Sequence, residues 1–108
     1  MADIEGCCPF QAAIDLLSKR HMMTILWFLQ QEGPARFNDI KRAADVNPVT
    51  LSQRLGELER SGVVDRRAFK ETPPRVEYEL TRKGWELVPL MDALGKWASK
   101  HQLAEATA

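Results

Sequence analysis

Apolar side chains recur at helical spacing in two stretches near the start of the chain. The first stretch predicts a helix over 9–19, because Pro9 suits a first helical turn, where its missing N–H costs nothing. The second predicts a helix over about 21–31 that Gly33-Pro34 stops, and its apolar stripe is wide enough for a central helix. The two stripes consist of Phe10, Ala13, Ile14 and Leu17, and of Met22, Ile25, Leu26 and Leu29.

Two more helical patterns occupy residues 37–61, and a polar turn at 45–47 separates them. Asn47 suits the N-cap of the second helix and Pro48 its first position, whereas Gly62 is a typical C-terminal stop. Two short helices joined by a tight turn are typical of a helix-turn-helix. The apolar stripe of the second helix is formed by Leu51, Leu55 and Leu58.

The apolar period changes from helical to alternating over residues 63–80. Val76, Tyr78 and Leu80 alternate with polar residues and are predicted to face the core, and the segment from Val63 to Phe69 predicts the partner strand. The connection contains two prolines, which cannot pair in a ladder and stiffen the loop. The stretch 63–80 is therefore a predicted antiparallel wing, and Ala35-Arg36 adds a short strand.

A last helix is predicted over 82–101, with Thr81 as its N-cap and a kink at Pro89. The fold class that follows is mainly α with a small antiparallel β-wing. One winged helix-turn-helix domain covers 9–101, and flexible segments are expected at 1–8 and 102–108. The apolar face of the last helix consists of Leu87, Leu90, Met91, Leu94 and Trp97.

Composition changes this picture only through where the charges lie. The 108 residues carry zero net charge, but residues 36–83 hold 11 Lys and Arg against 8 Asp and Glu. The predicted helix-turn-helix and wing are thus the basic half of a neutral protein, which suits a DNA-binding face. The acidic first residues differ from a signal peptide, and the longest apolar run, 25–29, is too short for a bilayer. We therefore expect a protein of the reducing cytoplasm without a membrane partner.

Motifs of catalysis and metal binding are missing from the sequence. It has no Gly-rich phosphate loop, no H-E-x-x-H and no C-x-x-C, so we expect neither an enzyme nor a cofactor. Cysteine and histidine occur at only four positions, and their spacing does not predict a metal site. These positions are Cys7, Cys8, His21 and His101.

The second helix of the pair is long enough for the major groove of B-DNA. With the leucine stripe buried, Gln53 lies on the opposite face and can pair with adenine, while Val49 or Thr50 can meet a thymine methyl. Arg54 lies nearer the buried side and suits a phosphate. The alternative is that these are solvated polar residues of an amphipathic helix. The candidate DNA-contacting residues of this helix are Asn47, Val49, Thr50, Ser52, Gln53 and Arg54.

Basic residues also follow the predicted wing. Arg75 comes directly after the two prolines, and an arginine held out by a stiff turn can enter a minor groove or bind phosphate. Arg66, Arg67 and Lys70 add charge nearby, and the DNA-contacting candidates of the wing are Arg66, Lys70 and Arg75. The alternative is an ordinary hairpin whose charges serve solubility. The helix pair and the basic wing together favour DNA binding.

Several short motifs are more specific than this general layout. They are Cys8-Pro9 before a helix, Gly33-Pro34 followed by Arg36-Phe37, Leu51-Ser52-Gln53-Arg54-Leu55 with Glu57-Leu58, and Pro73-Pro74-Arg75-Val76-Glu77-Tyr78-Glu79-Leu80-Thr81 with Gly84 soon after. Together they resemble the HxlR-type transcriptional regulators over about residues 7–98. The chain departs from the family pattern at His21, where Trp is frequent, and at Gly56, which weakens the helix by roughly 1 kcal/mol relative to Ala.

The resemblance implies a homodimer that binds an inverted-repeat operator on double-stranded DNA. It also implies that the first and last helices, 9–19 and 82–101, form the dimer contact. A small winged core cannot cover the apolar faces of both helices, although packing within one subunit is the alternative. The interface candidates are Phe10, Ile14, Leu90, Leu94 and Trp97.

Cys8 matches an N-terminal cysteine with which some HxlR-type regulators sense oxidants or electrophiles. A thiol near a helix N-terminus is favoured as the reactive thiolate. The alternative is a small helix-start residue without a signalling role. No small-molecule effector is identified by the sequence. A winged-helix module for protein–protein contact, without DNA binding, is the second hypothesis for the whole chain.

Overall fold

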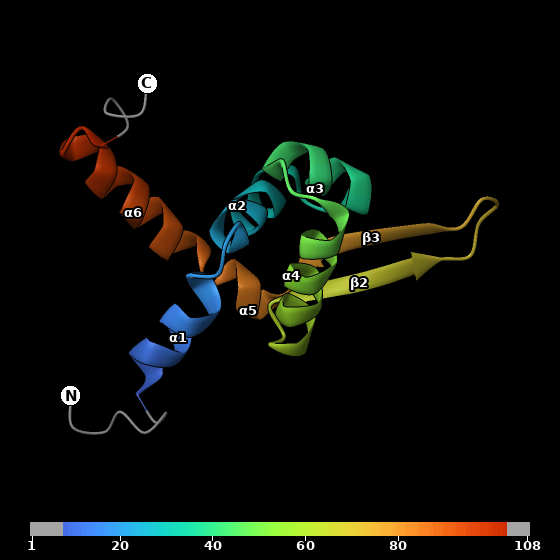
Figure 1. Cartoon of the computed structure of the whole chain (residues 1–108), viewed down its shortest axis with the longest axis horizontal. Helices are drawn as coiled ribbons and strands as arrows, with labels where there is room; N and C mark the ends of the chain where they lie inside the picture. The colour runs from blue at the N-terminus through green and yellow to red at the C-terminus, as the bar shows by residue number, and fades with distance from the viewer. Residues whose placement is uncertain (1–7, 104–108) are drawn as a thin grey trace.

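The computed structural model describes residues 8–103, and the predicted flexible segments 1–8 and 102–108 fall mostly outside this range. The described part is mainly helical with one small antiparallel sheet (Figure 1), so the predicted winged helix-turn-helix fold is confirmed. The helices are α1 (Pro9–Leu17), α2 (Met22–Glu32), α3 (Phe37–Ala44), α4 (Pro48–Arg60), α5 (Arg82–Trp85) and α6 (Val88–Lys100). The strands are β1 (Ala35–Arg36), β2 (Val64–Phe69) and β3 (Arg75–Leu80).

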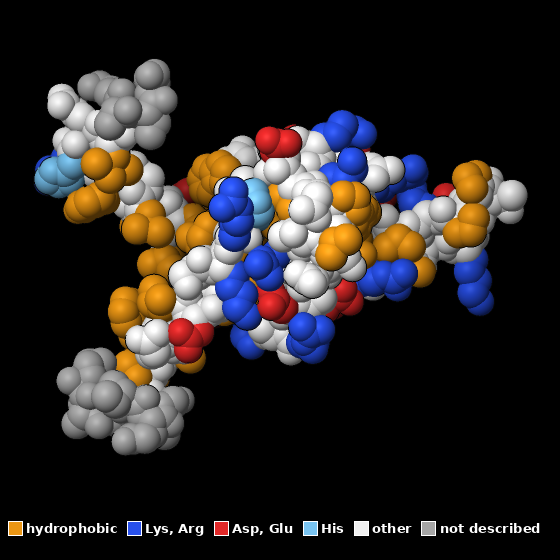
Figure 2. Space-filling model, in the orientation of Figure 1, with side chains coloured by type: hydrophobic (Ala, Val, Ile, Leu, Met, Phe, Trp, Pro, Cys, Tyr) orange, Lys and Arg blue, Asp and Glu red, His pale blue; other side chains and the backbone are white. Residues whose placement is uncertain are grey.

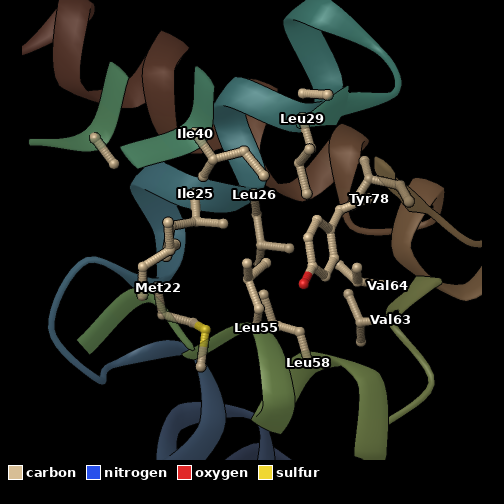
Figure 3. Packing of buried hydrophobic residues seen from close by; sticks show 14 of the residues in the cluster. Met22, Ile25, Leu26, Leu29, Ile40, Leu55, Leu58, Val63, Val64 and Tyr78 are labelled. Atoms are coloured by element: carbon tan, nitrogen blue, oxygen red, sulfur yellow. The ribbon is translucent and has the colours of Figure 1, made fainter. Parts of the chain in front are cut away.

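The core forms around α2, as the width of its apolar stripe predicts. Its four stripe residues are fully buried, and they pack against apolar side chains of α3, α4 and the sheet (Figure 3). Trp27, a further apolar residue of α2, stays exposed on the side of this helix that the core does not reach. The largest fully buried side chains are Met22, Ile25, Leu26, Leu29, Ile40, Leu51, Leu55, Leu58 and Val64.

The sheet has the order β1-β3-β2 and is antiparallel throughout. Ala35 pairs with Tyr78, and the hairpin runs from the Val64–Leu80 pair to the Phe69–Arg75 pair. Tyr78 and Leu80 are buried and Val76 is half-buried, so the predicted alternation on β3 is confirmed. From the end that holds the Val64–Leu80 pair, the β2–β3 hairpin extends away from the helices as a wing (Figure 1).

The predicted single helix over 82–101 is wrong: the chain forms α5 and α6 with a break at 86–87. Thr81 caps α5 as expected, since its Oγ1 accepts a hydrogen bond from the Gly84 N–H at 3.1 Å. Pro89 lies in the first turn of α6, where a proline lacks no hydrogen bond, and therefore starts this helix instead of kinking a longer one.

Helices α1 and α6 project from the central helices on the side opposite the wing (Figure 1). The first helix ends at Leu17, two residues before the predicted end, where the Ser18 N–H bonds to the Ile14 carbonyl. No residue of 9–17 is buried, and α6 buries only Met91. Within residues 8–103 every helix is too short or too polar to span a bilayer.

Candidate nucleic-acid interface

Helix α4 is held at its start by a side-chain cap and along its length by the leucine stripe. Asn47 Oδ1 accepts a hydrogen bond from the Thr50 N–H at 2.8 Å, and Pro48 occupies the first turn, as predicted. Because all three leucines of the stripe are buried, the direction of every other side chain on α4 is determined. The polar face opposite the leucines therefore points away from the core.

Three of the predicted α4 contact residues are exposed on this face. They are Val49, Ser52 and Gln53, and the isopropyl group of Val49 is unusual for a solvated position because it is 68% exposed. Thr50 is half-buried, and Asn47 is exposed although its oxygen is occupied by the cap. Residues 49–53 thus present an apolar group, a hydroxyl and an amide side by side, the chemical groups that distinguish base pairs in the major groove.

Arg54 occupies a different environment from this exposed set. Its Nε donates to the carbonyl of Arg20 at 2.9 Å, and its Nη1 donates to Glu57 Oε1 at 3.1 Å. Lys19 Nζ donates to the other carboxylate oxygen of Glu57 at 3.1 Å. The guanidinium that the sequence assigns to a phosphate is therefore engaged inside the chain, against the turn between α1 and α2.

The charge of Glu57 is stabilised by this arrangement. The hydrogen bond from Lys19 is the largest influence and lowers the pKa of Glu57 below its ordinary value, and partial burial opposes it. The charge of Lys19 and the contact with Arg54 lower the pKa further. Neither Lys19 nor Glu57 is predicted as a functional residue by the sequence, because they lie 38 positions apart and nothing local joins them.

On the wing, two of the three predicted contact residues point to solvent. Arg66 and Lys70 are exposed and form no ion pair with the described part of the chain. The neighbouring Arg67 differs, since its Nε lies 2.6 Å from Glu79 Oε2 across the hairpin. Figure 2 shows Lys and Arg side chains both over the central helices and along the wing.

The expectation that the stiff turn holds the Arg75 side chain out is wrong. Arg75 is the first residue of β3, and its guanidinium lies over the ring of Phe69 at 4.2 Å from the centroid. Its Nη2 lies 3.0 Å from Glu71 Oε2, and its Nε lies 3.7 Å from Glu77 Oε2, too far for a hydrogen bond. The strand pairing of Arg75 with Phe69 folds the side chain back along the hairpin, so it braces the wing.

Cys8 is the N-cap residue of α1 and is only 7% exposed. Its side chain makes no capping hydrogen bond. Cys7, the second cysteine of the sequence, lies outside the described residues. Among residues 8–103, no three Cys, His, Asp or Glu side chains converge as a metal site would require.

The five interface candidates on α1 and α6 all lie at the surface. Phe10, Ile14, Leu90, Leu94 and Trp97 are each more than one-third exposed. Four of them line a groove of about 360 Å³ between the two helices, together with Leu17, Ser18 and Met23. Trp97 lies farther along α6, 5.1 Å from the ring of His101. Figure 2 shows the apolar surface of these projecting helices.

A helix-turn-helix with an attached wing and two projecting apolar helices matches a known family. The family model described as HxlR-like helix-turn-helix matches residues 16–106. This chain belongs to the HxlR-like family. The predicted resemblance is thus confirmed, and the chain is a winged-helix transcriptional regulator of this type.

Individual transcriptional regulators are similar to this chain along most of their length. The HTH-type transcriptional regulator YvaP of Bacillus subtilis is 43% identical over 101 residues, which are 93% of each chain. The reduced form of the regulator YodB from B. subtilis has a TM-score of 0.78 and 36% identity, over 86% of this chain and 92% of YodB. The oxidized form of the redox regulator HypR has a TM-score of 0.77 and 29% identity, over 86% and 96%. YodB is also similar in its diamide-treated and quinone-bound forms.

Proposed function

We propose that this HxlR-like protein binds an inverted-repeat operator on double-stranded DNA as a homodimer in the cytoplasm. The observation that carries the proposal is the exposed face of α4, where Val49, Ser52 and Gln53 face away from a fully buried leucine stripe. Placed in a major groove, Gln53 pairs with adenine and Val49 meets a thymine methyl. Arg66 and Lys70 on the wing bind the phosphate backbone beside it.

The contacts of each side chain indicate its role within the proposed site. Thr50 and Asn47 lie at the start of α4, the end that enters the groove first in this motif. Arg54 and Arg75 are supporting residues in the proposal, because both guanidinium groups are engaged with carboxylates of the same chain. Operator choice therefore depends on residues 49–53, and general affinity depends on the wing.

A homodimer accounts for the apolar surfaces of α1 and α6. A two-fold dimer places the same surface of each copy against the other, so the groove between the two helices receives apolar side chains of the second copy. Two copies related by a two-fold axis present two α4 helices, and a DNA site of matching symmetry is an inverted repeat.

The proposal is tested by the affinity for fragments selected from the host genome, measured by fluorescence anisotropy at several salt concentrations. Gln53→Ala is expected to change which sequences are preferred, since it removes a base contact. Lys70→Ala is expected to weaken binding about equally for all sequences and to lower the salt slope by about 1, because one phosphate contact is lost. Lys96→Ala, an exposed lysine of α6, is the matched control and should change neither.

Binding that stays unchanged in both variants, or that does not fall with salt, would contradict DNA recognition by this face. The alternative of a protein–protein module would then gain support. Such a module has no counterion release and therefore no steep salt dependence.

A second proposal is that Cys8 makes the regulator responsive to oxidants. Its support is the position of this thiol at the start of α1, the proposed dimer helix, together with the similarity to YodB in its reduced and diamide-treated forms and to HypR in its oxidized and reduced forms. In the reaction, the thiols of two copies each lose a proton and an electron to diamide. One S–S bond forms, and the azo group of diamide is reduced to a hydrazine.

Non-reducing electrophoresis and operator affinity before and after diamide test the redox proposal. We expect a covalent dimer and a changed affinity in the wild type and in Cys7→Ser, and neither effect in Cys8→Ser. The redox role of Cys8 is excluded if Cys8→Ser behaves like the wild type.

A further inference from the structure

The turn between α1 and α2, residues 18–21, is fastened to α4 by two side chains of that helix. Arg54 reaches the carbonyl of Arg20 at 2.9 Å, and Glu57 holds Lys19 at 3.1 Å. The two side chains also contact each other, with 3.1 Å between Arg54 Nη1 and Glu57 Oε1. We call Lys19, Arg54 and Glu57 the latch.

The turn itself has a defined shape. The Met22 N–H donates to the Lys19 carbonyl at 3.0 Å, and His21 adopts a left-handed backbone conformation with φ of 70°. A non-glycine residue rarely adopts this conformation, so the direction in which the chain enters α2 is constrained. Lys19 and Arg20 both lie within this ordered turn. The two contacts from α4 therefore hold the turn as a whole.

The position of α1 depends strongly on this turn. None of residues 9–17 is buried, and only Leu16 and Leu17, at the end nearest the turn, pack against the core. The rest of α1 projects away from the central helices (Figure 1). A helix held at one end takes its direction from that end, and this end is joined by the latch to α4.

We propose that Lys19, Arg54 and Glu57 are positioning residues that set the direction of α1 relative to α4 and thereby the spacing of the two operator half-sites. The inference rests on the proposed DNA-binding homodimer. In that dimer α1, together with α6, determines where the second copy lies, and α4 determines where the groove is read. A rigid connection between them gives one preferred distance between the two α4 helices.

Arg54 offers a way to separate this role from a phosphate contact. A lysine retains the charge and binds phosphate as a point charge, but it lacks the planar fork that reaches the Arg20 carbonyl and Glu57 together. Arg54→Lys therefore preserves a phosphate contact and disrupts the latch. Lys19→Met disrupts it from the other side, since Lys19 lies on the turn and outside the proposed reading face.

The experiment compares one selected operator with two versions in which a base pair is inserted or removed between the half-sites. We expect the wild type to lose affinity roughly tenfold with each altered version, a size usual for coupling between two parts of a protein. Arg54→Lys and Lys19→Met are expected to lose less than about threefold, with an unchanged preference for half-site bases. Lys96→Met is the control and should discriminate like the wild type.

The double variant Lys19→Met with Glu57→Gln should discriminate no better than Lys19→Met alone, because Glu57→Gln removes the same ion pair and also weakens the contact with Arg54. Melting temperatures are measured alongside, and a loose fold would lower them and base preference together. If the wild type binds no DNA fragment, both the proposed function and the proposed role of the latch are contradicted. If the wild type binds without a preference for half-site spacing, or if the variants distinguish the spacings as the wild type does, only the proposed role of the latch is contradicted.

Discussion

The central unit, which consists of α2, α3, α4 and the sheet, buries most of its apolar side chains, whereas the projecting helices α1 and α6 leave similar apolar faces exposed. Leu26 and Leu55 in the centre are fully buried, whereas Leu94 and Trp97 on α6 are 51% and 55% exposed. Both regions have apolar residues at helical spacing, so periodicity alone does not separate them. The difference shows that an amphipathic pattern indicates which face is apolar but not whether the same chain covers it. In the proposed homodimer, a second copy covers the faces of α1 and α6.

A similar contrast divides the arginines of the proposed DNA-binding half. Arg66 points to solvent from the middle of β2, while Arg75 is bound to Glu71 and stacked on Phe69. Charge of one sign thus serves two purposes on a single hairpin. One group is available to a polyanion, and the other stiffens the element that carries it.

The largest expected effect on the free energy of unfolding comes from a buried leucine of the core. Leu26→Ala is expected to lower the free energy of unfolding by about 3 kcal/mol, since it leaves a cavity among side chains that cannot collapse to fill it. Chemical denaturation at fixed protein concentration measures the change. Val49→Ala is the control, because this side chain is 68% exposed and lies outside the proposed dimer surface, and equal losses in both variants would contradict the burial difference.

The joint between the central unit and α6 is the next most sensitive position. A Cβ at Gly84 would lie 2.3 Å from the backbone oxygen of Val63, so Gly84→Ala is expected to destabilise the fold by about 2–3 kcal/mol in thermal unfolding. Gly56→Ala is the matched control. Its new Cβ would meet only the flexible end of Arg60 at 3.3 Å, and we expect a gain of about 0.5–1 kcal/mol.

The proposed dimer surface is tested by placing a charge on it. Leu94→Asp is expected to weaken dimerisation by about 2 kcal/mol, because a carboxylate would be desolvated where an apolar group is covered in the wild type. Sedimentation equilibrium measures the association, and circular dichroism should show unchanged helix content. A wild type that stays monomeric, or a variant that associates as strongly, would contradict the homodimer.

The smallest expected effect concerns the latch and pH. The pKa of Glu57 in the folded protein is below its ordinary value, so the charged carboxylate contributes to the free energy of unfolding. This contribution is fully present above the unfolded pKa and is lost as pH falls through the folded pKa. The size should be about 0.5 kcal/mol or less, because the pair is partly solvated. Urea denaturation from pH 6 down to about 3 should show this loss in the wild type and a flatter profile in Glu57→Gln.

Much of the fold follows from the sequence because its signals act over a few residues. The cap of Asn47 on Thr50, the start of α4 at Pro48 and the alternation along β3 each depend on neighbours within one or two turns. The exposure of the α4 face that we propose to contact DNA also follows, since burying the leucine stripe determines the direction of every other α4 side chain.

Only the tertiary structure decided which role each arginine has and where the last helix breaks. The contact of Arg54 with the Arg20 carbonyl joins residues 34 positions apart, and the brace on Arg75 depends on the register that places it opposite Phe69. The break at 86–87 arises where α5 closes on the base of the sheet and Pro89 begins a new helix. Local patterns specify elements and faces, but long-range charge pairs form only after packing has brought distant segments together, and no periodicity in the sequence records them.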